Sequence, residues 1–169
     1  PFIEPQRLSK SGLQRLETRL DALAKHGIDP VTIEHFTEFL RDAPAQELGR
    51  IRPLAVARNY GLDGQQFVVS CLYAAREGLL NIGWDILCPT CRISARVTDT
   101  LKEMQQHERC EVCDLDFEVD MANSLELIFR AHPEIRAADV GTYCIGGPEH
   151  SPHVVVQIRL AAGERSELS

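Results

Sequence analysis

The stretch "CPTCRISARVTDTLKEMQQHERCEVC", residues 88–113, contains two Cys-x-x-Cys pairs in a chain that has six cysteines altogether. Each short pair can turn tightly enough for both sulfur atoms to face one point, and two such turns on neighbouring hairpins complete a tetrahedron. Four thiolates leave no open coordination position, so such a site neither activates water nor binds a substrate. The spacing therefore predicts a four-Cys zinc ribbon that holds a structural Zn²⁺, with a redox pair or an iron site as alternatives. The predicted ligands are Cys88, Cys91, Cys110 and Cys113.

Four thiolates on one divalent ion carry a net charge of about −2, by charge counting at a closed site. Three cations, Arg92, Lys102 and Arg109, lie close to the cysteines in sequence. We expect them to offset this charge.

The segment before the ribbon predicts helices. Residues 6–27, "QRLSKSGLQRLETRLDALAKHG", carry apolar residues at three- and four-residue steps, and Gly27 and Pro30 end the pattern. This stripe either packs on its own domain or forms a dimerising coiled-coil seam. Its members are Leu13, Leu16, Leu20 and Leu23. A second helix is expected over residues 31–43, with four apolar side chains facing inward: Val31, Ile33, Phe36 and Leu40.

Residues 45–87 predict helix, turn, helix and strand, the order of a winged-helix unit whose wing leads into the metal site. Pro53 interrupts the first helix, and Asp63 is the expected N-cap of the second. The second helix, "GQQFVVSCLYAAREG", presents apolar side chains with Arg76 as its one cation. A recognition helix needs several polar or basic side chains that reach base edges, so contact with protein is favoured over contact with DNA.

The segment after the ribbon predicts strands. In "DLDFEVD", residues 114–120, apolar and acidic residues alternate, as in a half-buried strand with a solvated acidic face. Further strands are expected at 124–130 and on both sides of a Gly-Gly-Pro turn within 138–160. The fold class is therefore α+β. We expect N-terminal helices in 1–43, the winged-helix-like unit in 44–87, the zinc ribbon in 88–121, and in 122–169 a small antiparallel β region that continues further.

Catalytic motifs are scarce in this sequence, which has no phosphate-binding glycine loop, serine nucleophile elbow or zinc-protease motif. One cysteine with two nearby histidines suggests a catalytic hypothesis, in which the thiol is a nucleophile and a histidine is its base. The same loop, "GGPEHSPH", could instead be a rigid ligand- or partner-contacting loop, or a plain β turn with exposed histidines. The residues concerned are Cys144, Gly146, Gly147, His150 and His153.

The overall composition is that of a soluble globular protein, with 44% hydrophobic and 25% charged residues. The formal net charge of −7 argues against a surface that grips phosphate backbones non-specifically. No apolar run reaches the roughly 20 residues of a membrane helix. Clustered cysteine pairs without a disulfide framework favour a reducing, cytoplasmic location.

Four blocks of the sequence resemble one known family: "RIRPLAVARNYGLD", "GLLNIGWDILCPTCR", "CEVCDLDFEVD" and "YCIGGPEHSPHVVVQIRLAAGE". The chain is similar to the uncharacterised N-terminal domain that precedes the catalytic domain of bacterial class III adenylate/guanylate cyclases. The resemblance implies a non-catalytic regulatory or assembly module in cyclic nucleotide signalling. Its partners would be its own C-terminal cyclase domain, a signalling protein, or a second copy in a homodimer. The alternative function is that of a winged-helix/zinc-ribbon domain that binds nucleic acid.

Overall fold

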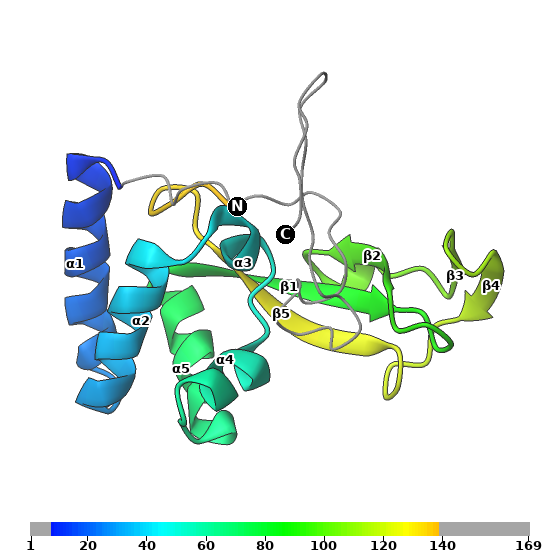
Figure 1. Ribbon diagram of the computed structural model, residues 1–169, viewed down its shortest axis with the longest axis horizontal. Coiled ribbons are helices and arrows are strands. Elements are labelled where there is room, and N and C mark those ends of the chain that lie inside the picture. The colour runs from blue at the N-terminus through cyan, green and yellow to red at the C-terminus, as the bar shows by residue number, and fades with distance from the viewer. Residues whose placement is uncertain (1–7, 139–169) are drawn as a thin grey trace, which may run out of the picture.

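The computed structural model of the protein describes residues 8–138, and these form five α-helices and two small antiparallel sheets (Figure 1). The helices are α1 Lys10–Ala24, α2 Pro30–Asp42, α3 Ala45–Gly49, α4 Pro53–Asn59 and α5 Gly64–Arg76. The strands are β1 Leu80–Leu87, β2 Ser94–Thr98, β3 His107–Cys110, β4 Leu115–Glu118 and β5 Leu125–Ala131, and a 3₁₀ turn covers Leu101–Glu103. The predicted α+β class is confirmed. The strands expected within 138–160 lie outside the described residues.

Local capping explains where the longer helices begin. The side chain of Ser9 accepts a hydrogen bond from the Gly12 amide at the start of α1, and Asp29 does the same for two amides of α2. The Asp63 carboxylate accepts from the Gln66 amide at 2.8 Å, which confirms the predicted N-cap of α5. Each of these helices thus starts where a short polar side chain satisfies an otherwise unpaired amide.

The leucine stripe of α1 packs into the core of its own chain. Leu16, Leu20 and Leu23 are at most 7% exposed, while Leu13 is 37% exposed at the edge of the stripe. The core that they enter also holds side chains from α2, α5, β1 and β5, so the first two helices share one core with the later elements. A dimer seam built on this stripe would have Leu13 as its one exposed member.

One expected core residue of the second helix lies elsewhere. Val31 follows Pro30 in the first turn of α2 and is 50% exposed, whereas Phe36 and Leu40 are buried as predicted. Phe39, which we did not assign inward, is 8% exposed and belongs to the same core. The buried face of α2 is therefore centred on its C-terminal half.

The three-stranded sheet has the order β2–β1–β5, with both pairings antiparallel. Strand β5 pairs with β1 from Leu80 opposite Ala131 to Ile86 opposite Leu125. Ile51, between α3 and α4, adds an isolated bridge to Phe129 on β5. The sheet thus crosses the boundaries expected at residues 88 and 122, because β5 returns past the ribbon to pair with β1.

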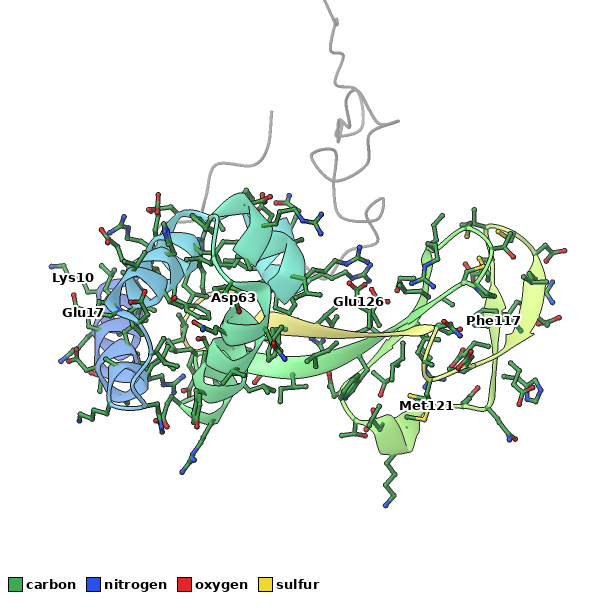
Figure 2. The ribbon with its side chains drawn as sticks, turned by 90° about the horizontal axis from the view of Figure 1, so that it is seen from below. Lys10, Glu17, Asp63, Phe117, Met121 and Glu126 are labelled. Carbon is green, nitrogen blue, oxygen red and sulfur yellow. The ribbon has the colours of Figure 1, made fainter. Side chains whose placement is uncertain are left out.

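The helices and the ribbon lie at opposite ends of the molecule. Figure 2 shows Lys10 and Glu17 at the helical end, Phe117 and Met121 at the ribbon end, and Glu126 between them. The paired strands β1 and β5 connect the two ends. Among the described residues, no helix has the length and apolar character needed to span a bilayer.

Candidate metal centre

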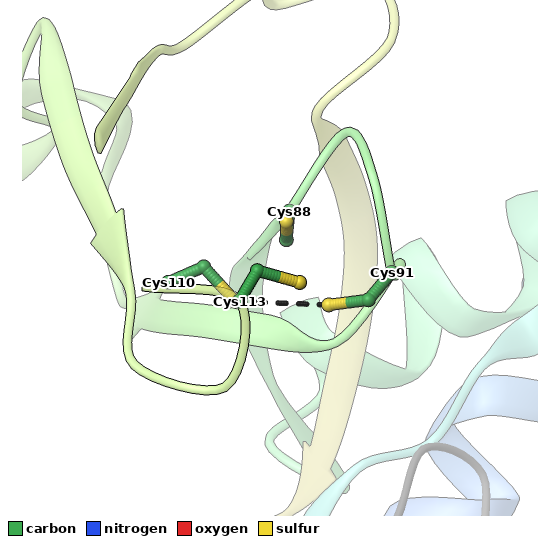
Figure 3. A group of neighbouring side chains, drawn as sticks. All are labelled: Cys88, Cys91, Cys110 and Cys113. Carbon is green, nitrogen blue, oxygen red and sulfur yellow. Dashed lines mark hydrogen bonds between the residues drawn. The ribbon is translucent and has the colours of Figure 1, made fainter. Parts of the chain in front are cut away.

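The four cysteines of residues 88–113 come together at the ribbon end (Figure 3). Their sulfur atoms all lie within 4.8 Å of one another, and the Sγ atoms of Cys91 and Cys110 are 3.6 Å apart. Cys88 and Cys110 are buried, whereas Cys91 and Cys113 are more accessible. Sulfur atoms this close, drawn from two turns, can hold one metal ion. No second group of this kind occurs in residues 8–138.

Two similar turns build this cluster. The first follows β1 and is closed by hydrogen bonds from the Arg92 amide to the Cys88 carbonyl, 3.0 Å, and from the Cys88 amide to the Ile93 carbonyl, 2.8 Å. The second joins β3 to β4. In each turn the residue after the second cysteine is left-handed, with φ of 61° at Arg92 and 52° at Asp114. This conformation is uncommon outside glycine, and here it turns the chain back after both sulfurs have faced inward.

The electrostatics of the turns favour a cation. Burial raises the pKa of Cys88, but the amides of Cys91 and Thr90 and the neighbouring thiols outweigh it and bring the pKa to about 7. The adjacent thiols raise the pKa of Cys113 to about 12. Without a metal, one thiolate therefore opposes the ionisation of the next, and a bound cation would remove this opposition.

The ribbon has little apolar core of its own. Its apolar cluster consists of Ile86, Phe117 and two of the cysteines, and partly buried side chains such as Met104 pack against them. A cluster of this size buries too little apolar surface to order the loops around it. A metal held by four thiolates would supply the missing free energy of folding.

Two of the cations expected to offset the thiolate charge also make contacts of their own. Arg109 pairs with the carboxylates of Asp114 and Asp116 on the exposed face of the β3–β4 hairpin. Arg92 donates to the Asn123 carbonyl. The acidic residues of "DLDFEVD" thus place carboxylates beside Arg109, and its effect on the thiolate charge stays a prediction.

A buried carboxylate lies on β1, close in sequence to Cys88. Asp85 on β1 is 0% exposed, and its Oδ2 atom is 3.5 Å from Arg50 Nε and 3.5 Å from Arg52 Nη2. Arg52 Nε is also 3.3 Å from Glu126 Oε2 on β5. Arg50 reaches across to Ser94 Oγ on β2, at 3.3 Å. These groups, which we name the Asp85 cluster, tie the segment between α3 and α4 to all three strands of the sheet.

Sequence reasoning missed the Asp85 cluster. Its signal was present as an acidic residue inside the apolar strand "LLNIGWDIL" and an Arg-x-Arg pair in "RIRP". A charged residue in a buried strand needs a partner of opposite charge, and Arg is the usual one. Burial raises the pKa of Glu126, while Arg52 lowers it.

The outer face of α5 carries two exposed apolar side chains between polar ones. Val69 is 46% exposed and Leu72 is 43% exposed, whereas Phe67 is buried in the core. Arg76 is exposed in the last turn of the helix. The remaining site candidates, Cys144, Gly146, Gly147, His150 and His153, lie outside the described residues.

Comparison with known proteins gives a family and no function. No curated protein and no solved structure shows a significant match to the chain. Residues 13–142, more than half of the chain, match the family described as "Family of unknown function (DUF5939)". That description says nothing of cyclases, so the resemblance to the region before cyclase domains stays a prediction. The matched segment covers the core, the Asp85 cluster and all four metal-site cysteines, and the chain therefore belongs to the DUF5939 family.

Proposed function

We propose that this chain is a non-catalytic regulatory or assembly module that is stabilised by a structural Zn²⁺. The observation that carries the proposal is the donor set: four sulfurs of one chain lie within 4.8 Å of one another. Zn²⁺ prefers four thiolates in tetrahedral geometry, and such a shell leaves no position for water or substrate. The ion would hold the two turns of the ribbon together and would not take part in a reaction.

The order of the extended segments supports a winged-helix arrangement. Ile51 bridges to β5, β5 pairs with β1, and α4 and α5 lie between Ile51 and β1 in the chain. This is the order of a helix-turn-helix followed by a wing, with the metal ribbon inserted between the two strands of the wing. Winged-helix units serve as scaffolds for many functions, so the surface of the second helix decides the function here.

That surface supports contact with protein. The centre of the exposed face of α5 consists of Val69 and Leu72, which would be desolvated favourably against an apolar partner surface. We propose that the partner is a class III cyclase catalytic domain that follows this region. The module would then bias the pairing of cyclase domains, and it would not itself need a dimerising stripe.

The test measures nucleotide cyclisation, with ATP and with GTP, by the natural gene product that carries this region. The wild type is compared with Val69→Glu/Leu72→Glu and with the matched control Gln65→Glu, an exposed position in the first turn of the same helix. Unchanged zinc content and circular dichroism establish that each variant is folded. We expect the double variant to change the rate several-fold and the control to leave it unchanged. Equal rates in all three proteins, or no cyclisation, would rule out the cyclase proposal.

A nucleic-acid function is the second candidate, and the helix-turn-helix order of α4 and α5 favours it. Its test is fluorescence anisotropy with mixed-sequence DNA and RNA at about 20 mM salt, where non-specific phosphate contacts are strongest. Binding that weakens steeply as salt is added would favour this candidate over protein contact. Absence of binding at low salt would eliminate it.

A further inference from the structure

The four cysteines of the metal centre divide into a buried pair and an accessible pair. Cys88 and Cys110 are at most 1% exposed and belong to the small apolar cluster of the ribbon. Cys91 is only partly buried, and Cys113 is the most exposed of the four. A small solute in water therefore meets Cys113 and Cys91 before it meets the two cysteines that the apolar cluster encloses.

The accessible pair spans the two turns of the ribbon. Cys91 belongs to the turn after β1, and Cys113 belongs to the turn between β3 and β4. Figure 3 shows their side chains pointing toward one another, and their sulfur atoms lie within 4.8 Å. The sulfur atoms of a disulfide are about 2.05 Å apart, so these two atoms need to approach by less than about 3 Å. A disulfide between them would cross-link the same two turns that a metal ion would join.

A thiolate metal site keeps its sulfur atoms in the form that reacts with oxidants. The thiolate, and not the thiol, is both the metal ligand and the nucleophile. Susceptibility to oxidation follows thiolate character and exposure, and Cys113 combines the two. Cys71 provides the contrast, because it is 0% exposed in the helical core and burial raises its pKa, which keeps it a protonated thiol.

We propose that Cys113 and Cys91 form an oxidative modification site, at which hydrogen peroxide converts the two thiolates into a disulfide and the metal is released. In the first step the Cys113 thiolate attacks one peroxide oxygen, the O–O bond breaks, and the leaving hydroxide takes a proton from the solvent. The Cys91 thiolate then attacks the sulfur of the Cys113 sulfenic acid, the S–S bond forms, and a second hydroxide leaves and is protonated. Two electrons pass from the thiolates to the peroxide, which becomes two water molecules.

The reaction changes what holds the ribbon together. Cys88 and Cys110 are the sulfur donors of the cluster that remain, and two thiolates do not complete the four-coordinate shell that Zn²⁺ prefers. The ribbon is then held by the metal when it is reduced and by a covalent bond when it is oxidised. This inference rests on the proposed structural Zn²⁺, and it deepens the proposed regulatory role because peroxide becomes an input to the module.

The experiment treats the zinc-loaded protein with hydrogen peroxide and follows zinc release with a chromogenic chelator. Peptide mass mapping, after free thiols have been blocked, identifies the paired cysteines. The zinc content is measured before peroxide is added. Absence of zinc at that point would contradict the proposed function as well as this inference, whereas retention of zinc in peroxide would contradict this inference alone.

Two variants sharpen the test. Cys113→His removes the most exposed sulfur and keeps a zinc ligand at this position, as in sites with three cysteines and one histidine. Cys71→Ala is the matched control, because it removes a cysteine that lies outside the metal centre. If Cys113→His does not load with zinc, the disulfide map of the wild type decides the question by itself.

We expect one disulfide between Cys91 and Cys113 for each zinc released, with Cys71 still a free thiol, and recovery of zinc binding after reduction with dithiothreitol. Cys113→His should release zinc at least about tenfold more slowly than the wild type, because the most exposed thiolate is gone, and Cys71→Ala should release it at the wild-type rate. A disulfide between another pair of cysteines, sulfinic or sulfonic acid at Cys113 in place of a disulfide, or equal release rates in Cys113→His and the wild type would overturn the proposal.

Discussion

Replacing Asp85 with asparagine removes the negative charge at the centre of the Asp85 cluster and keeps the size of the side chain. Asp85 is fully buried, and two guanidinium groups lie 3.5 Å from its Oδ2 atom. Without it, Arg50 and Arg52 retain one nearby carboxylate, Glu126. Loss of one partner from a buried ion pair leaves uncompensated charge and costs about 3–5 kcal/mol. We therefore expect Asp85→Asn to lower the free energy of unfolding by about 3 kcal/mol, the low end, because both arginines keep some contact with water.

The assay is urea denaturation of the zinc-loaded protein at pH 7, followed by circular dichroism. The matched control is Asp99→Asn on the same hairpin, since Asp99 pairs with Arg130 but its side chain is 67% exposed. An exposed pair contributes about 0–1 kcal/mol, so the control should remain within 1 kcal/mol of the wild type. Equal stability of Asp85→Asn and Asp99→Asn would refute the reasoning, because it would mean that the buried charge is not held by the arginines.

Three further predictions concern the metal, the core and the loss of stability at low pH. Cys110→Ser should abolish stoichiometric zinc binding, measured by mass spectrometry under native conditions, because Cys110 is one of four sulfurs in a closed shell. Leu23→Ala should cost about 2–5 kcal/mol in thermal or urea unfolding and Leu13→Ala less than about 1 kcal/mol, because Leu23 is 0% exposed and Leu13 is 37% exposed. The hydrogen bond from Arg19 lowers the pKa of Glu134 below 4.5, so this pair stabilises the fold above that pH and the contribution is lost as the pH falls through the lowered pKa. Glu134→Gln should therefore lose less stability between pH 5 and pH 3 than the wild type. An equal loss of unfolding free energy in the variant and the wild type would contradict the pairing.

The features that sequence predicted well are those that depend on short-range geometry. The Cys-x-x-Cys spacing determines which sulfurs can converge, and the structure brings all four within 4.8 Å. The N-cap at Asp63 likewise depends on one carboxylate, and the helix break before Pro53 depends on one proline ring. Such features need no knowledge of what the segment packs against.

The features that sequence did not predict depend on contacts between distant segments. The leucine stripe of α1 has the same period whether it packs on its own chain or on a second one. Only the packing of the folded core shows that it packs on its own chain. The expected boundary at residue 122 lies between β1 and β5 in the sequence, and these strands pair with each other although the ribbon separates them. The burial of Asp85 follows from that pairing and from the return of Arg50 and Arg52 to the sheet.

The central claim, a closed and non-catalytic zinc site, is tested most directly by X-ray absorption at the zinc edge of the purified protein. We predict one zinc per chain with four sulfur neighbours at about 2.3 Å and no oxygen or nitrogen in the first shell. This result would match the four converging sulfurs of residues 88–113. A first shell with three sulfurs and one lighter atom would contradict the claim, because it would leave a coordination position for water or a substrate.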